Sequence, residues 1–201
     1  MDVKSLKGIA IVSIEQGEKV GTVDNILFNF DDKRVIAFKM IKPGLLRSGG
    51  IVLKMEDVES IGRDAVMIRN REKIRELKEE RDLQSRPDLS ALSALRVVTQ
   101  DGTYVGNLAT AQFEPKTGLL THLEVTGGGF IDKLRRNKTI AIDEVASIGT
   151  DVAVVPNSYA PQGADPEPDN SEDDSEPEPM ELPERTGPEQ TSKEKRGEIL
   201  Q

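Results

Sequence analysis

The chain has 201 residues, room for one domain or two small ones. It contains no cysteine, which excludes disulfides, thiolate catalysis and cysteine-ligated metals. Of its 36 acidic and 27 basic residues, 13 and 4 lie in residues 156–201, so the first 155 residues hold 23 of each and the tail carries the whole net charge of −9. Overall charge therefore gives no reason to expect nucleic-acid binding by the folded part.

The first half of the chain predicts short β-strands separated by glycine-containing turns. β-branched and alternating apolar residues mark the expected strands, which are residues 8–14, 20–30, 35–40 and 51–55. Gly17 stands in the first turn, where a hairpin favours a positive φ. The apolar period slips between Val23 and Ile26, which predicts a β-bulge near residues 24–25.

A connector, residues 70–89, predicts a short charged helix. Asn70 can cap its start and Pro87 ends it. The apolar stripe of Ile74 and Leu77 is thin, so we expect a mostly solvated helix that acts as a spacer or lies against one domain. Opposite charges recur at helical spacing, in the pairs Arg75/Glu79 and Lys78/Asp82.

The second half of the chain repeats the first. The stretches VESIGRDAV (58–66) and VASIGTDVA (145–153) coincide at five of nine positions. A shift of 85 positions aligns residues 15–30 with 100–115, and the shift becomes 87 after a loop that is two residues longer in the second copy. The period is too long for a solenoid, so the chain holds two copies of a small domain.

We predict an all-β fold of two small β-barrels in tandem, formed by repeat 1 (residues 1–69) and repeat 2 (residues 90–156). Closing each sheet removes exposed edges. A unit of about seventy residues buries only roughly 60% of its unfolded surface, which favours packing between the copies. Residues 157–201 predict a disordered, acidic, proline-rich tail, for which the roles of electrostatic tether, competitor for a basic loop, linear motif and inert extension stay open.

The order of these motifs resembles the PRC-barrel domain, present twice. The residues that carry the resemblance are Gly17, Val20, Gly21, Phe28 and 58–64 in repeat 1, and Gly102, Val105, Gly106, Phe113, 127–130 and 145–151 in repeat 2. The resemblance implies a six-stranded barrel used as an adaptor, with no catalytic residues. The family includes the cytoplasmic part of the photosynthetic reaction-centre H subunit, the C-terminal domain of a ribosome maturation factor and many stand-alone prokaryotic members. The chain shows neither the membrane helix of the first nor the N-terminal domain of the second, so neither role transfers.

The repeated phrase is interpreted as structural. A nucleophilic serine needs a neighbouring base, and repeat 1 has no histidine; a phosphate cradle would open a helix, whereas a strand follows here. We expect Val58 and Ile61 to point into the barrel and Asp64 to hydrogen-bond the turn backbone. The only histidine, His122, lies on an expected strand with its side chain directed away from the core, as a surface residue rather than a base or ligand. The structural-motif residues are Gly21, Ser60, Gly62, Asp64, Gly106, Ser147, Gly149 and Asp151.

Two loops, residues 42–50 and 126–138, offer the best functional candidates. Apolar residues ringed by cations suit a protein groove, an anionic membrane surface or RNA. The competing interpretation is that they plug the barrel ends or pack one copy against the other. The candidate partner-binding residues are Leu45, Leu46, Arg47, Phe130, Ile131, Lys133, Leu134, Arg135 and Arg136.

The sequence thus predicts a cytoplasmic, non-enzymatic adaptor or scaffold that binds an unidentified protein partner. The alternative is an RNA- or ribosome-associated maturation or assembly factor, weakened by an aromatic content of 3% without tryptophan. Peripheral contact with an anionic membrane is a further partner hypothesis, with no transmembrane segment. No cofactor and no metal site are expected.

Overall fold

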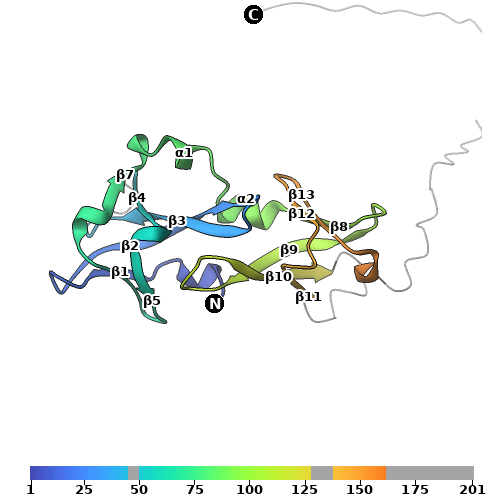
Figure 1. Ribbon diagram of the computed structural model, residues 1–201, viewed down its shortest axis with the longest axis horizontal. Coiled ribbons are helices and arrows are strands. Elements are labelled where there is room, and N and C mark those ends of the chain that lie inside the picture. Colours follow the sequence, from blue (N-terminus) through green and yellow to red (C-terminus); the bar gives the residue numbers. More distant parts are fainter. Residues whose placement is uncertain (45–49, 128–137, 162–201) are drawn as a thin grey trace, which may run out of the picture. The chain divides into compact units, whose positions relative to one another are not determined.

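Two curled β-sheets, one in each repeat, form the fold (Figure 1). The computed structural model describes residues 1–44, 50–127 and 138–161. It confirms an all-β architecture that matches two tandem barrels. No helix among these residues is long and apolar enough to cross a membrane.

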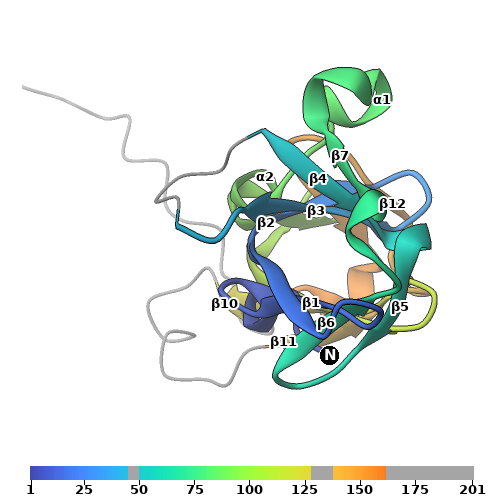
Figure 2. The ribbon, with the colours of Figure 1, turned by 90° about the vertical axis from the view of Figure 1, so that its left-hand side faces the viewer.

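The sheet of repeat 1 has the order β5-β6-β1-β2-β3-β4-β7 and curls around its core (Figure 2). β1 and β6 are parallel, and the other pairs are antiparallel. The register of β2 and β3 shifts between Val23 and Asn25, and Gly17 has a φ of 65°, so the predicted bulge and turn are confirmed. The strands are β1 (Ala10–Ser13), β2 (Glu18–Asn29), β3 (Arg34–Ile41), β4 (Ile51–Lys54), β5 (Val58–Ile61), β6 (Ala65–Ile68) and β7 (Ile74–Glu76).

The sheet of repeat 2 has the order β11-β10-β9-β8-β13-β12 and repeats the same connections. β8 and β13 form the parallel pair that corresponds to β1 and β6. β7 has no counterpart among the described residues. The strands are β8 (Arg96–Thr99), β9 (Tyr104–Phe113), β10 (Leu120–Gly127), β11 (Lys138–Ala141), β12 (Ser147–Ile148) and β13 (Val152–Val155).

Glycine is required at equivalent positions of β2 and β9, where the next strand comes close. A Cβ on Gly106 would lie 1.9 Å from the carbonyl oxygen of Thr126, and the φ of Gly106 is 155°. A Cβ on Gly21 would lie 3.0 Å from the carbonyl oxygen of Ile41. Any larger residue would force the two strands apart.

The connector packs on repeat 1 rather than standing free. Its charged helix, α1 (Arg81–Gln84), is shorter than the pattern predicted, because Ile74 pairs with Leu53 as part of β7 and Leu83 is buried on the outer face of the sheet. The 3-10 turns around it are η2 (Met55–Asp57), η3 (Arg71–Lys73) and η4 (Leu77–Glu79), and α2 (Leu89–Ala94) follows.

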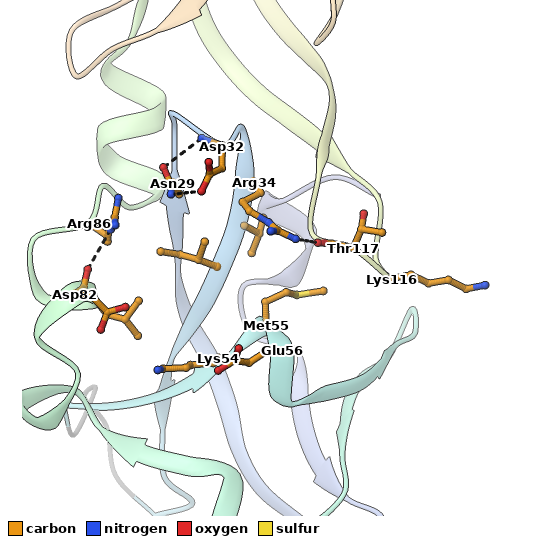
Figure 3. A pocket seen from close by; sticks show the side chains of 13 residues that line it. Asn29, Asp32, Arg34, Lys54, Met55, Glu56, Asp82, Arg86, Lys116 and Thr117 are labelled. Atoms are coloured by element: carbon orange, nitrogen blue, oxygen red, sulfur yellow. Dashed lines mark hydrogen bonds between the residues drawn. The ribbon is translucent and has the colours of Figure 1, made fainter.

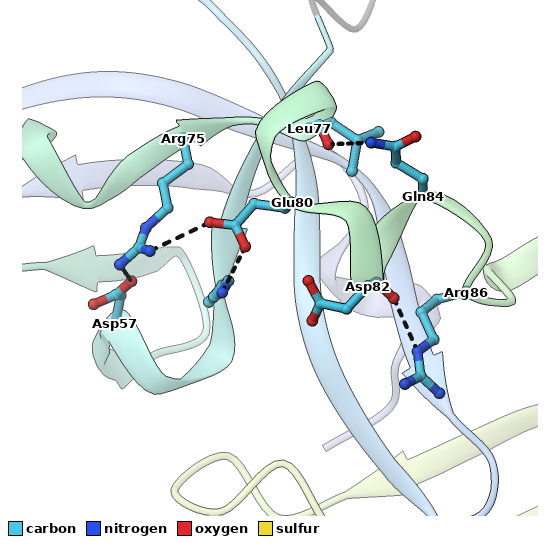
Figure 4. Close-up of polar contacts among 8 residues, drawn as sticks. Asp57, Arg75, Leu77, Glu80, Asp82, Gln84 and Arg86 are labelled. Carbon is cyan, nitrogen blue, oxygen red and sulfur yellow. Dashed lines mark hydrogen bonds and ion pairs between the residues drawn. The ribbon is translucent and has the colours of Figure 1, made fainter.

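A chain of ion pairs ties the connector to repeat 1 (Figure 4). Asp57, with a side chain only 7% exposed, contacts Lys73 at 2.9 Å and Arg75 at 3.2 Å. Glu80 joins Arg75 at 3.3 Å to Lys54 at 2.6 Å. The hydrogen bond between Lys54 and Glu80 raises the pKa of the lysine and lowers the pKa of the carboxyl, so both groups are charged at neutral pH.

One hydrophobic core runs through both repeats, which lie in a single compact unit, Met1–Gly163. At the join, the antiparallel bridge between Arg34 and Leu119 brings the starts of β3 and β10 together. Val35 donates to the carbonyl of Gly118, and Leu120 donates to that of Lys33, so the contacts are reciprocal. Equivalent residues face each other, as in an isologous dimer interface.

Two arms, residues 1–9 and 87–95, reinforce the join by crossing to the opposite repeat. Asp2 of the first arm bridges Gln112 of β9, and Asp88 of the second arm bridges Leu27 of β2. The arms add buried apolar side chains to the core, namely Val3, Leu6, Leu92 and Leu95. The arms also contain the 3-10 turn η1 (Lys4–Leu6) and α2, respectively.

The two arms are anchored by equivalent aspartates. Asp2 accepts hydrogen bonds from the backbone amide of Lys4 at 2.6 Å and from the hydroxyl of Thr110 at 3.0 Å. Asp88 accepts from the amide of Ser90 at 2.9 Å and from Asn25 at 3.0 Å. Each carboxylate therefore caps its own arm and binds the opposite repeat.

Candidate functional site

A groove lies where repeat 1, the connector and repeat 2 meet (Figure 3). We call it the junction groove; it has a volume of about 460 Å³. Its residues come from the β2–β3 hairpin, the end of β4, η2, α1 and the β9–β10 turn. They are Asn29, Asp32, Arg34, Val35, Ile36, Lys54, Met55, Glu56, Asp82, Leu83, Arg86, Lys116 and Thr117.

Three basic side chains of the junction groove, Arg34, Arg86 and Lys54, make contacts that hold its walls. The guanidinium of Arg34 donates to the carbonyl of Thr117 at 2.6 Å and so links the two repeats. Arg86 donates to the carbonyl of Asp82 at 3.1 Å, and Lys54 is paired with Glu80.

The lining of the junction groove is mostly polar and charged. Its lining holds no serine, cysteine or histidine, and its one hydroxyl side chain, Thr117, accepts a hydrogen bond from the amide of Leu119 at 3.2 Å. Its walls mix lysine and arginine with aspartate and glutamate, unlike the mostly apolar lining of small-molecule pockets. In the described part of the chain, no three His, Cys, Asp or Glu side chains gather where they could hold a metal ion.

A second depression, the hairpin pocket, lies beside the β3–β4 hairpin of repeat 1. It has a volume of about 600 Å³, and Lys42 and Pro43 in its wall lead directly into the loop that carries Leu45, Leu46 and Arg47. Its residues are Glu18, Lys19, Val20, Lys42, Pro43, Arg71 and Ile74. With three basic side chains against one acidic one, it suits an anionic or mixed polar surface.

The nine candidate partner-binding residues all lie outside the described residues, because positions 45–49 and 128–137 are not among them. The structure does describe the ends of both hairpins. β3 and β10 cross as an antiparallel pair at their first residues, so they run in opposite directions from the join. Each has 8 residues, and at about 3.3 Å per residue it carries its hairpin end roughly 26 Å from the join.

The residues of the repeated phrase lie at strand ends and turns. Val58 and Ile61 are half-buried against the core, and the amide of Gly62 donates to the carbonyl of Ala65 at 2.9 Å. Asp64 differs from expectation: it contacts the Arg63 side chain at 3.5 Å, both groups being exposed, rather than the turn backbone. In repeat 2, Val145 and Ile148 are buried, Gly149 donates to Val152, and Asp151 accepts from the Thr150 hydroxyl. Ser60 and Ser147 are exposed.

His122 lies on the outer face of β10, as the alternation predicts, and is half-buried. Its Nδ1 atom is buried and has no hydrogen-bond partner. It pairs across the strands with Gln112 and Ala141, and neither offers the ring an acid–base partner.

Sequence reasoning did not identify the residues of the junction groove, because its walls come from three separate segments. A signal for the arms was present: a shift of 86 aligns Asp2 with Asp88, Leu6 with Leu92 and Ile9 with Leu95. No comparable pattern marks Arg34 or Thr117, whose contact depends on the backbone of the turn.

Comparison with known families agrees with the fold. The model of the PRC-barrel domain matches the chain twice, over residues 1–75 and 88–160. The search of curated proteins found no match. The two matches cover most of the chain and follow the two structural repeats, so this chain belongs to the PRC-barrel family and carries the domain twice in tandem.

Proposed function

We propose that this protein is a non-enzymatic, cytoplasmic adaptor that binds another protein through the hairpin loops of its two barrels. PRC-barrel domains are interaction and scaffold modules and are generally non-catalytic. The loops combine apolar anchors with cations, the composition that favours the centre of a protein interface.

The observation that carries this proposal is the opposite direction of the two hairpins. β3 and β10 start at the shared Arg34–Leu119 bridge and end on opposite sides of it. The continuous core between them makes the two barrels one body with two separated ends. Such a body is suited to hold two contacts apart, whereas an enzyme gathers its groups into one site.

The test is affinity purification of the full chain from its native host. We expect a reproducible protein partner that is lost from the triple variant Phe130→Asp/Ile131→Asp/Leu134→Asp. The matched control changes two exposed apolar residues away from the join to Asp: Ile14 and Val152, which are 54% and 37% exposed. Loss of the partner from the control alone would contradict the proposal, as would recovery of no partner under several lysis conditions.

RNA binding is the second candidate, and the basic side of the hairpin pocket favours it. Lys19, Lys42 and Arg71 line that pocket, and the loop of repeat 2 adds Arg135 and Arg136. Phosphate contacts would make binding fall steeply with salt. RNA affinity that weakens at least tenfold between about 50 and 200 mM salt, and again in Arg135→Ala/Arg136→Ala, would favour it; absence of binding at low salt would reject it.

A further inference from the structure

The two sheets end differently at equivalent strands. In repeat 1, the outer edge of β4 is covered by β7, with Val52 paired to Arg75 and Leu53 to Ile74. In repeat 2, the equivalent strand β11 is the last in its sheet, and no described residue pairs with its outer edge. β11 is therefore an edge strand. Its counterpart in repeat 1, β4, shows how a further strand can pair with this edge.

The hydrogen-bonding groups of β11 that point outward can be assigned from its pairing with β10. The amide of Ile142, just after β11, donates to the carbonyl of Thr121 in β10 at 2.9 Å. Because the pattern alternates along an antiparallel pair, Ile140 also faces β10, while the N–H and C=O groups of Thr139 and Ala141 face away. In repeat 1 the same outward position is Val52, which the connector fills with Arg75.

The side chains beside this edge are also unlike those of repeat 1. There, the outer face consists of Leu27, Ala37 and Val52, all fully buried under the connector. The equivalent residues of repeat 2 are Gln112, His122 and Thr139; the first two are half-buried and Thr139 is exposed. Gln112 donates to Glu124 at 2.9 Å, and the buried Nδ1 of His122 lacks a partner. This face is polar, so it suits an occupant with polar or charged side chains.

Charge indicates which occupant fits. In repeat 1, Asp57 holds two basic residues, Lys73, which precedes β7, and Arg75, which lies within it. Its counterpart in repeat 2 is Glu144, which is exposed next to Asp143 and accepts a hydrogen bond from the hydroxyl of Tyr159 at 2.6 Å. A carboxylate has further acceptor positions, so Glu144 can still pair with a basic side chain.

The chain's own continuation is a poor occupant. Residues 161–176 contain seven acidic and no basic side chains, which the carboxylates at 124, 143 and 144 repel. The occupant is therefore expected from another molecule.

We propose that the edge of β11 (Lys138–Ala141) receives an extended, basic segment of a partner protein by antiparallel strand addition, as β4 receives β7. The proposal rests on the proposed function only in that the partner is a protein. Backbone pairing with Thr139 and Ala141 provides affinity, and basic side chains facing Glu124, Asp143 and Glu144 provide selectivity.

The test uses the full chain and two acetylated hexapeptides, Lys-Ile-Arg-Val-Lys-Val and the acidic control Glu-Ile-Glu-Val-Glu-Val. Amide exchange followed by NMR should show that the amides of Thr139 and Ala141 exchange rapidly in the free protein and become protected by the basic peptide alone. Thr139→Pro removes only an outward N–H, and we expect roughly tenfold weaker binding. Thr139→Val, which restores the residue of repeat 1, keeps the N–H and should bind as the wild type does.

A second variant keeps the test decisive if Thr139→Pro disturbs the fold. Asp143→Lys/Glu144→Lys should reverse the preference from the basic to the acidic peptide. Three results would overturn the proposal: protection of both amides without peptide, which means that the chain's own tail fills the edge; self-association that protects them, which means a second copy does; or equal binding of both peptides. Peptide binding should persist in the Phe130→Asp/Ile131→Asp/Leu134→Asp variant, so failure of the edge and failure of the loop interface are distinguishable.

Discussion

Repeat 1 and repeat 2 share one strand order, but the outer faces of their sheets differ in polarity and in burial. In repeat 1 that face is apolar and covered by the connector, with Leu83 packed against Leu27 and Val52. In repeat 2 the equivalent face is polar and has no described cover. After a duplication, covering one sheet requires apolar residues on it, and leaving the other uncovered requires polar ones. The difference leaves the polar outer face of repeat 2 without a cover among the described residues.

The largest effect is expected at the glycines that let neighbouring strands approach. Gly106→Ala should destabilise the protein by about 4 kcal/mol or more, because its Cβ would lie 1.9 Å from a backbone oxygen. Gly21→Ala should cost about 2 kcal/mol, because its closest neighbour is the flexible end of Met40. Urea denaturation measures both, and equal losses would show that the two barrels tolerate strain alike.

Exchanging residues of the two outer faces tests the contrast directly. Leu27→Gln places an amide under the connector and should lower the free energy of unfolding by about 3 kcal/mol. The reverse change, Gln112→Leu, affects a half-buried site and should change it by less than about 1 kcal/mol. Similar losses in the two variants would remove the distinction between a covered and an open face.

A third effect concerns a side-chain contact that repeat 1 makes to repeat 2 and that repeat 2 does not make in return. Lys33 donates to the carbonyls of Ile142 at 3.2 Å and Val145 at 2.6 Å, whereas its equivalent, Gly118, has no side chain. Lys33→Met should cost about 2 kcal/mol, the contribution of a charged hydrogen bond. Lys116→Met, an exposed lysine in the facing turn, is the control and should be neutral in thermal unfolding.

The ion pair of the connector should give a smaller, pH-dependent effect. The lowered pKa of Glu80 means that its stabilisation is present above the ordinary value of 4.5 and is lost as the pH falls through the lowered value. The raised pKa of Lys54 means that its stabilisation is present below 10.5 and is lost as the pH rises further. Glu80→Gln should therefore flatten the loss of stability between about pH 5 and 3. The free energy of unfolding would be measured by urea denaturation at each pH. The same loss of stability at acidic pH in Glu80→Gln and in the wild type would show that Glu80 does not hold the connector.

The smallest effect is a titration without much change in stability. The hydrogen bond from Tyr159 to Glu144 raises the pKa of the phenol to about 12, because ionisation would place two negative charges together. The chain has two tyrosines, so ultraviolet difference titration can assign the transition by comparison with Tyr159→Phe. Glu144→Gln should lower that pKa; no change would mean that Glu144 is free of Tyr159.

The sequence predicted the strands well because half-buried strands alternate in a way that residues show directly. The slip at Val23 and Ile26 even located the bulge. It underestimated the connector, since a single leucine, Leu83, makes the main apolar contact and one residue has no periodicity. The junction groove was not predictable at all, because Arg34 meets Thr117 through a backbone carbonyl that every residue possesses.

The crossing of the arms has a consequence for how the chain folds. The terminal amine of Met1 donates to the carbonyl of Phe113, 112 positions away. At synthesis rates of about 5–20 residues per second, Met1 waits roughly 6–22 s for that partner to be made. The arm that packs against repeat 1, residues 87–95, is likewise complete only when Leu95 has been made. Because each barrel packs against an arm from the opposite repeat, we expect folding to be completed only late in translation.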